Sequence, residues 1–439
     1  MPRRNSYDSP WFFAAALFIA STALAETPSV IAVRNARIHT ASGPVIENGN
    51  VIVRKGLIEA VGANAAIPPD AWVIEGAGLH VYPGLIDGLS TWGIPAPTPP
   101  PPGTVAAVAA APPPARGPED RPANTSWVHA QELVQPADKN IAAARDTGYT
   151  TAVVFPNAGI FAGQGAAMNL AGEKTGQMVV ASSTGQYISL ATRGFTSFPG
   201  SLMGAIAYVR QIYLDADHYM ASQRAYRDNA RGIRRPDYDR ALEGVIESPR
   251  VLLPASRRVE IDRMLRFGAE LKRPFVLYGG HQAYRSADLL KAAGAPILIS
   301  LNWPKANKDA DPEAEAEASL RTLEMRDKAP SGPAALDKAG TKFAFYSGGI
   351  EKPSDLRKAV KRAIDAGLSP AAALRALTLS VAEIYGFADR TGSIEPGKIA
   401  NLVVIGGDLF QESTKIRYVL IDGVKYEPAP EPPKEEEKK

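Results

Sequence analysis

An alternation of strand-like and helix-like segments fills the middle of this 439-residue chain, and it limits the possible folds more than any other feature. Short apolar runs are each followed by a longer stretch with helical patterning. Repeated strand–helix units imply a parallel sheet covered by helices, which is the α/β fold class. We count about six such strands, at Val81–Ile86, Thr151–Phe155, Arg250–Pro254, Phe275–Tyr278, Pro296–Leu301 and Lys342–Tyr346.

The two ends of the chain have a different pattern. Residues 30–76 and 400–426 hold short runs of alternating apolar residues bounded by Gly and Asn, which is typical of hairpins. Asp422-Gly423 is a strong hairpin turn. We therefore expect the ends to pair into one small β-sandwich, built from residues 26–78 and 391–427, around an α/β part at residues 79–390.

Two segments have a composition of their own. Residues 95–122 are rich in Pro and Ala, which predicts a flexible insertion after the first strand of the α/β part. Such an insertion could overhang a pocket on the catalytic face, or it could be a tolerated surface loop, which we favour. The tail at residues 428–439 consists largely of Pro, Glu and Lys and is expected to be disordered.

The first 25 residues have the features of an export signal. Arg3 and Arg4 precede an apolar run from Trp11 to Leu24, and Ala23-Leu24-Ala25 matches an A-x-A cleavage site. An uncleaved anchor helix is the alternative, but the run is shorter than the ~20 residues that a spanning helix needs. We expect a periplasmic or extracellular protein that keeps no membrane anchor after cleavage.

Composition excludes several kinds of chemistry. The absence of cysteine rules out disulfides, thiolate metal sites and cysteine nucleophiles. The net charge of +3 is small and no long basic stripe stands out, so no nucleic-acid partner is predicted. The chain also has neither a P-loop nor a G-x-S-x-G nucleophile turn.

Three motifs carry a family resemblance. They are the V-Y-P-G-L-I-D stretch at residues 81–87, the helical positions between Ala373 and Gly386, and the G-S-I-E-P-G-K-I-A-N-L-V-V stretch at residues 392–404. In order and spacing they resemble the amidohydrolase superfamily, especially its imidazolonepropionase-like branch. The resemblance implies a closed (β/α)8 barrel with a small β-sandwich. It also implies hydrolysis of C–N bonds in cyclic amides, dipeptides or related small molecules.

The same resemblance implies a metal site that this sequence does not preserve. Relatives hold zinc or another divalent metal at the carboxyl ends of the barrel strands, where it lowers the pKa of a bound water. Leu89 and Thr91 stand at the two histidine positions of the first strand, and Tyr278 and Ser300 at those of the fifth and sixth strands. Gly348 stands where the last strand of a relative carries a catalytic aspartate.

Few other residues could serve as metal ligands at these strand ends. On the fourth strand, Val251–Pro254 contains no lysine that could bridge two metals. Of the five histidines, only His281 lies near the carboxyl end of a strand, where it is either a shifted ligand or, as we favour, an ordinary loop histidine. Asp87 is either a pocket carboxylate or a structural hydrogen-bond acceptor. No metal or other cofactor is therefore predicted, and the candidate pocket residues are Asp87, Tyr278, His281 and Ser300.

Three functions stay open on this basis. The chain could be a metal-free descendant that binds a small molecule or a peptide in the inherited pocket. It could be a non-catalytic subunit, either self-associating or paired with an active relative. It could also be a hydrolase with a rebuilt site around Tyr278, His281 and Ser300, which would require a nucleophile within hydrogen-bonding reach of a base.

Overall fold

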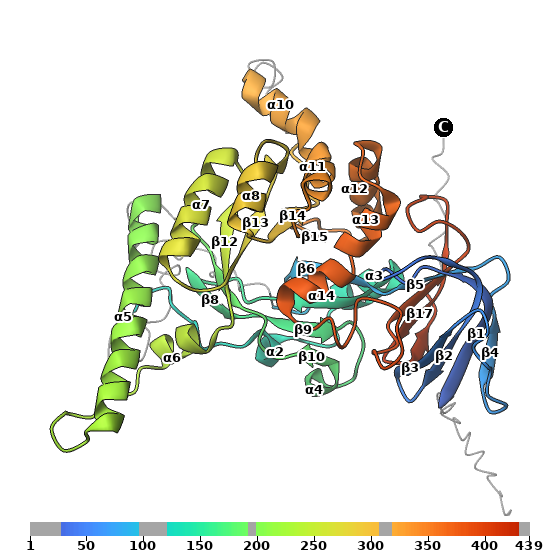
Figure 1. Cartoon of the computed structure of the whole chain (residues 1–439), viewed down its shortest axis with the longest axis horizontal. Helices are drawn as coiled ribbons and strands as arrows, with labels where there is room; N and C mark the ends of the chain where they lie inside the picture. The colour runs from blue at the N-terminus through green and yellow to red at the C-terminus, as the bar shows by residue number, and fades with distance from the viewer. Residues whose placement is uncertain (1–27, 96–120, 192–198, 307–317, 430–439) are drawn as a thin grey trace, which may run out of the picture.

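The computed structural model describes residues 28–95, 121–191, 199–306 and 318–429 (Figure 1). The predicted export signal, nearly all of the Pro- and Ala-rich insertion and most of the C-terminal tail lie outside these residues. Among the helices of the described segments, none is both long and apolar enough to cross a membrane.

One sheet unites strands from both ends of the chain. Its order is β18-β17-β16-β5-β1-β2-β3, and β4 pairs with β1 beside β5. Inward-facing side chains such as Ile31, Val33 and Leu402 form its apolar core. The strands are β1 (Val30–Ile38), β2 (Ile46–Arg54), β3 (Leu57–Gly62), β4 (Trp72–Glu75), β5 (His80–Pro83), β16 (Leu402–Ile405), β17 (Ile416–Ile421) and β18 (Val424–Tyr426). The boundaries of this region as a domain stay a prediction.

The predicted first strand of the α/β part is divided between two sheets. β5 belongs to the terminal sheet, whereas the next strand, β6 (Leu85–Ser90), pairs in parallel with β7 (Tyr149–Val154). The chain crosses between the sheets at Gly84, where an added Cβ would lie 2.0 Å from Thr150 Oγ1. Only glycine fits this close approach, which explains the Pro-Gly step in the motif.

The α/β part contains two sheets. A four-stranded sheet has the order β10-β9-β7-β6, and a six-stranded sheet has the order β15-β14-β13-β12-β11-β8. All six predicted strand regions are present, because β6, β7 and β12–β15 cover them. Besides β6 and β7, the strands of these two sheets are β8 (Phe161–Gln164), β9 (Ala166–Asn169), β10 (Val179–Ala181), β11 (Gln186–Ile188), β12 (Val251–Ala255), β13 (Phe275–Gly279), β14 (Ile297–Ser300) and β15 (Phe343–Tyr346).

Closure into an eight-stranded parallel barrel is not confirmed. β8, the edge strand of the six-stranded sheet, is followed in the chain by β9, which lies between β10 and β7 in the four-stranded sheet, and both strands pair antiparallel with their neighbours. At the other edges, Ser347 N donates to Asp87 Oδ1 at 2.8 Å, and no strand ladder joins β6 to β15 within the described residues. The arrangement is a mixed α/β fold whose two sheets meet along this seam.

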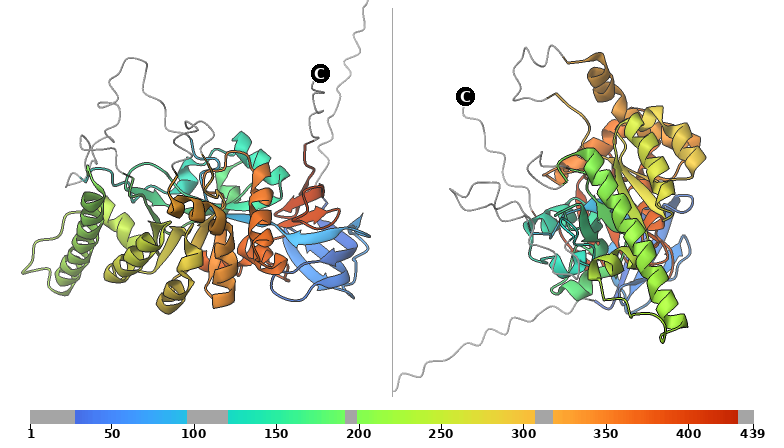
Figure 2. Two further views of the ribbon diagram at one scale, coloured as in Figure 1. Left: turned by 90° about the horizontal axis from the view of Figure 1, so that it is seen from above. Right: turned by 90° about the vertical axis from the view of Figure 1, so that its left-hand side faces the viewer.

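Helices cover the outer side of the sheets, and the long helix α5 lies at the opposite end of the molecule from the terminal sheet (Figures 1 and 2). The predicted helix over residues 201–230 is a single helix, whereas the one predicted over 370–379 breaks near Thr378. The helices are α2 (Ala130–Leu133), α3 (Lys139–Asp146), α4 (Thr175–Met178), α5 (Leu202–Asp228), α6 (Arg240–Glu247), α7 (Arg258–Glu270), α8 (Ala287–Ala293), α10 (Leu320–Lys328), α11 (Gly332–Ala339), α12 (Ser354–Asp365), α13 (Pro370–Ala376) and α14 (Leu379–Tyr385).

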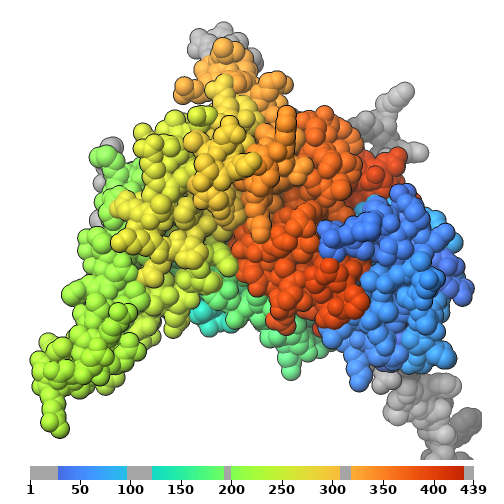
Figure 3. All heavy atoms as spheres, viewed as in Figure 1, coloured from blue at the N-terminus to red at the C-terminus, as the bar shows by residue number. Residues whose placement is uncertain are grey.

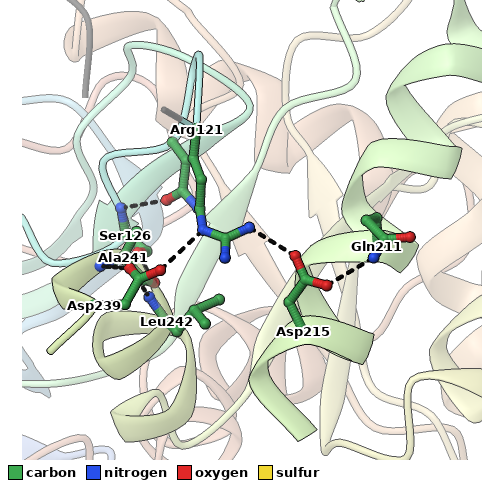
Figure 4. Close-up of polar contacts among 8 residues, drawn as sticks. Arg121, Ser126, Gln211, Asp215, Asp239, Ala241 and Leu242 are labelled. Atoms are coloured by element: carbon green, nitrogen blue, oxygen red, sulfur yellow. Dashed lines mark hydrogen bonds and ion pairs between the residues drawn. The ribbon is translucent and has the colours of Figure 1, made fainter. Parts of the chain in front are cut away.

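A buried ion-pair network ties the chain after the insertion to α5 and α6 (Figure 4). The Arg121 guanidinium donates to Asp215 Oδ2 at 2.7 Å and to Asp239 Oδ2 at 3.1 Å. Asp239 also caps α6 by accepting from the backbone N–H groups of Ala241 and Leu242. Because the arginine is buried against two carboxylates, this network fixes where the chain re-enters the fold.

Candidate functional site

The positions that hold metal ligands in relatives come together at the carboxyl ends of neighbouring strands. β13, β14 and β15 are paired in parallel, and β6 lies against β15. Leu89 is half-buried and packs against an apolar cluster inside the sheets, which includes Phe155 and Tyr385. Thr91 is exposed. The first-strand positions therefore hold one packing residue and one exposed hydroxyl in place of two imidazoles.

Three aromatic rings, which we call the tyrosine cluster, lie at these strand ends. Tyr187 of β11 lies 5.2 Å from Tyr278 of β13, and Tyr278 lies 6.4 Å from Tyr346 at the end of β15, as measured between ring centroids. The Tyr278 hydroxyl donates to the Ile188 carbonyl oxygen at 2.9 Å. Burial raises the pKa of each of the three phenols, so all three stay protonated near neutral pH.

Gly348 and Ser300 are in contact at the end of β14. An added Cβ at Gly348 would lie 2.0 Å from Ser300 Oγ and 3.1 Å from Ser300 Cβ. The φ angle of Gly348 is +63°, a left-handed conformation that glycine adopts most easily. Ser300 Oγ also accepts from the Asn302 backbone N–H at 3.2 Å. An aspartate at position 348 would therefore require Ser300 to change its rotamer or the backbone to shift.

Asp87 is a fully buried carboxyl group at the seam between β6 and β15. Its Oδ1 accepts from Ser347 N at 2.8 Å and, more weakly, from Leu89 N at 3.5 Å. Its Oδ2 has no hydrogen-bond partner in the part of the chain that the structure describes. Burial raises the pKa of Asp87 to about 6, and the hydrogen bonds from Ser347 oppose that rise only in part.

His281 contacts the backbone of Asn302, two residues beyond Ser300. Burial lowers its pKa, while a hydrogen bond to the Asn302 backbone and the charge of Glu260 raise it. Its Nε2 has no partner among the described residues. No hydrogen bond joins His281 to Ser300 or Tyr278 in those residues, so the base–nucleophile contact that a rebuilt hydrolase would need is not seen there. The roles of the four candidate residues stay predictions.

These side chains do not fit a divalent metal ion. Such sites need several imidazole, carboxylate or thiolate ligands that converge on one point. Within the described segments, no group of three or more His, Cys, Asp or Glu residues lies close enough together to hold a metal. The positions that correspond to ligands or the catalytic aspartate in relatives carry Leu89, Thr91, Tyr278, Ser300 and Gly348, and none of these has an imidazole or a carboxylate. We therefore derive no step that uses a metal.

Sequence reasoning missed two members of the tyrosine cluster. Tyr346 ends a strand that the sequence predicted, and its place at the carboxyl end of the strand could have identified it. Tyr187 lies on β11, a strand of three residues between Gly185 and a loop, which is too short for an alternating pattern to show.

Comparisons with known proteins support the family expectation. The Amidohydrolase family profile matches residues 274–425. An amidohydrolase from Thermotoga maritima MSB8 superposes with a TM-score of 0.71 at 23% identity, covering 90% of this chain and 99% of the other. A prolidase solved with N-methylphosphonate-L-proline gives a TM-score of 0.54 at 17% identity, with 91% and 99% covered. Phenylurea hydrolase B gives 0.50 at 17% identity, with 91% and 97% covered.

No curated protein matches the sequence at a significant level. Each of these three structures is below 25% identical to this chain, so the similarity establishes a common fold and leaves activity open. Residues 274–425 match the amidohydrolase family, and the structural neighbours, which include proteins described as amidohydrolases, share the fold of nearly the whole chain.

Proposed function

We propose that this protein binds a small amide or dipeptide at the tyrosine cluster and does not cleave it with a metal-bound hydroxide. The observation that carries the proposal is the contact between Gly348 and Ser300. Ser300 occupies the space that a side chain at position 348 would need, and the family resemblance places the catalytic carboxylate of relatives at this position. Restoring that carboxylate would require the backbone or Ser300 to move. A single substitution at position 348 would therefore not rebuild the catalytic position.

The tyrosine cluster is the feature that supports a ligand. Tyr187 and Tyr278 are only half-buried, so part of each ring is open to a bound molecule. Aromatic faces pack well against flat or saturated rings. The prolidase neighbour was solved with a proline analogue, and another neighbour is a phenylurea hydrolase. We therefore propose a ligand that carries a proline or phenyl ring next to an amide bond.

Titration calorimetry with phenylalanyl-proline tests the proposal. We expect saturable binding, weakened about tenfold by Tyr187→Ala because one ring contact is lost. Tyr418→Ala, in the terminal sheet, is the matched control and should bind as the wild type does. The same samples, incubated with added zinc or manganese, should release no proline. Metal-dependent release of proline would contradict the proposal, and so would the absence of binding.

A non-catalytic subunit is the second candidate. α10 buries none of its residues, and its Leu320 and Leu323 are 82% and 48% exposed. An exposed apolar helix outside the terminal sheet is what a subunit that pairs with an active relative would need. The subunit role is favoured if the dipeptide does not bind and the protein isolated from its own cells sediments with an active amidohydrolase. Export to the periplasm or cell exterior remains part of both proposals.

A further inference from the structure

The end of α5 and the segment that follows it form a strongly basic projection. We call residues 224–238 the arginine tip. It lies at the far end of α5 and extends beyond the body of the molecule in the space-filling view (Figures 1 and 3). Arg224, Arg227, Arg231 and Arg235 are all exposed among the described residues.

The net positive charge of the chain equals the net charge of this tip. The tip holds five arginines and two aspartates, a net charge of +3, which equals the net charge of the whole chain. The remaining charges of the protein therefore balance each other. In the sequence these arginines are interrupted by apolar and acidic residues, so they do not form a long basic stripe.

Most of the arginines in the tip lack a counter-charge. Arg234 pairs with Asp237 at 3.3 Å, and both side chains are well exposed. The other four have no ion-pair or hydrogen-bond partner among the described residues. Arginines elsewhere on the surface are commonly paired, as Arg210 is with Glu270 and Arg273 with Asp217. Arg227 in the last helical turn also favours the helix dipole, but that does not explain the arginines after the helix.

Two exposed apolar side chains accompany the arginines. Ile233 is 41% exposed and Tyr238 is 67% exposed, and both lie in the segment after α5. Apolar and aromatic residues among cations are typical of surfaces that enter the interfacial region of a lipid bilayer.

We propose that the arginine tip docks the protein peripherally on an anionic phospholipid membrane. Guanidinium groups bind phosphate in a bidentate manner, and clusters of basic residues are drawn to anionic lipid surfaces. A narrow projection can reach a flat membrane before the body of the protein does, and Ile233 and Tyr238 can then enter the headgroup layer. The inference is independent of the ligand proposed above.

Vesicle co-sedimentation of the full chain tests this proposal. We expect binding to vesicles that contain phosphatidylglycerol, weak binding to phosphatidylcholine alone, and loss of binding as salt is raised. The variant R231E/R235E should bind the anionic vesicles at least about 20-fold more weakly, since each basic residue near the surface contributes about a fivefold effect. Ile233→Ser should weaken binding several-fold at unchanged charge.

The matched control is R321E/R417E, which makes the same change in net charge at exposed arginines of α10 and β17. It should bind within about twofold of the wild type if local rather than total charge matters. Circular dichroism of each variant checks that it is folded. An equal loss in the control would overturn the proposal, as would binding to short duplex DNA or to polyglutamate but not to phosphatidylglycerol vesicles.

Discussion

A Gly348→Asp variant is expected to be less stable than the wild type by about 3 kcal/mol or more and to gain no hydrolytic activity. The new Cβ would meet Ser300 Oγ at 2.0 Å, and overpacking of this kind costs about 1–3 kcal/mol. The left-handed backbone at this position adds about 1 kcal/mol more for an aspartate. Chemical denaturation measures the change in the free energy of unfolding.

Gly349 provides the control, because its φ of +83° is also left-handed but an added Cβ would meet no atom within 4 Å. Gly349→Asp should therefore cost only about 1 kcal/mol. Adding Ser300→Gly to Gly348→Asp removes the nearest clashing atoms and should recover part of the lost stability. Equal effects at positions 348 and 349 would show that the contact with Ser300 is not what excludes aspartate.

An Asp87→Asn variant should change how stability depends on pH. The pKa of Asp87 is about 6 in the folded protein, above its ordinary value of 3.8. A raised folded-state pKa means that the contribution of the carboxyl group is fully present below about pH 3.8 and is lost as the pH rises through about 6. Across that range the wild type should lose about 3 kcal/mol relative to the variant.

The measurement is the free energy of unfolding of both proteins at several pH values. All other ionisable groups are the same in both proteins, so only the difference between the two reports on Asp87. Asp327→Asn, at an exposed site on α10, should show no such pH-dependent difference. A constant difference between Asp87→Asn and the wild type from about pH 4 to about pH 7 would show that the buried carboxyl has an ordinary pKa.

The strands of the α/β part could be predicted from the sequence because each is a continuous apolar run. Phe275–Tyr278 and Lys342–Tyr346 are close to the observed β13 and β15. The short strands β8 to β11 could not be predicted in this way. They have three or four residues each, and glycines such as Gly163 and Gly165 interrupt them, so neither length nor alternation marks them as strands.

The site was predictable only where a motif fixed the alignment. Leu89 and Thr91 follow the P-G-L-I-D stretch directly, so their replacement of histidines could be read from the chain. The contact between Ser300 and Gly348 joins positions 48 residues apart, and only the pairing of β14 with β15 brings them together. The hydrogen bond from Ser347 N to Asp87 joins residues that are 260 positions apart in the sequence, and they meet only because β6 lies against β15.

The metal content of the purified protein tests the central claim most directly. Elemental analysis after dialysis, with and without prior addition of zinc or manganese, should find much less than one ion per chain in both samples. That result is expected because leucine, tyrosine, serine and glycine stand at the inherited ligand positions. One or more tightly held ions per chain would contradict the account, restore a metal-dependent hydrolase as the function, and make His281 the first residue to replace.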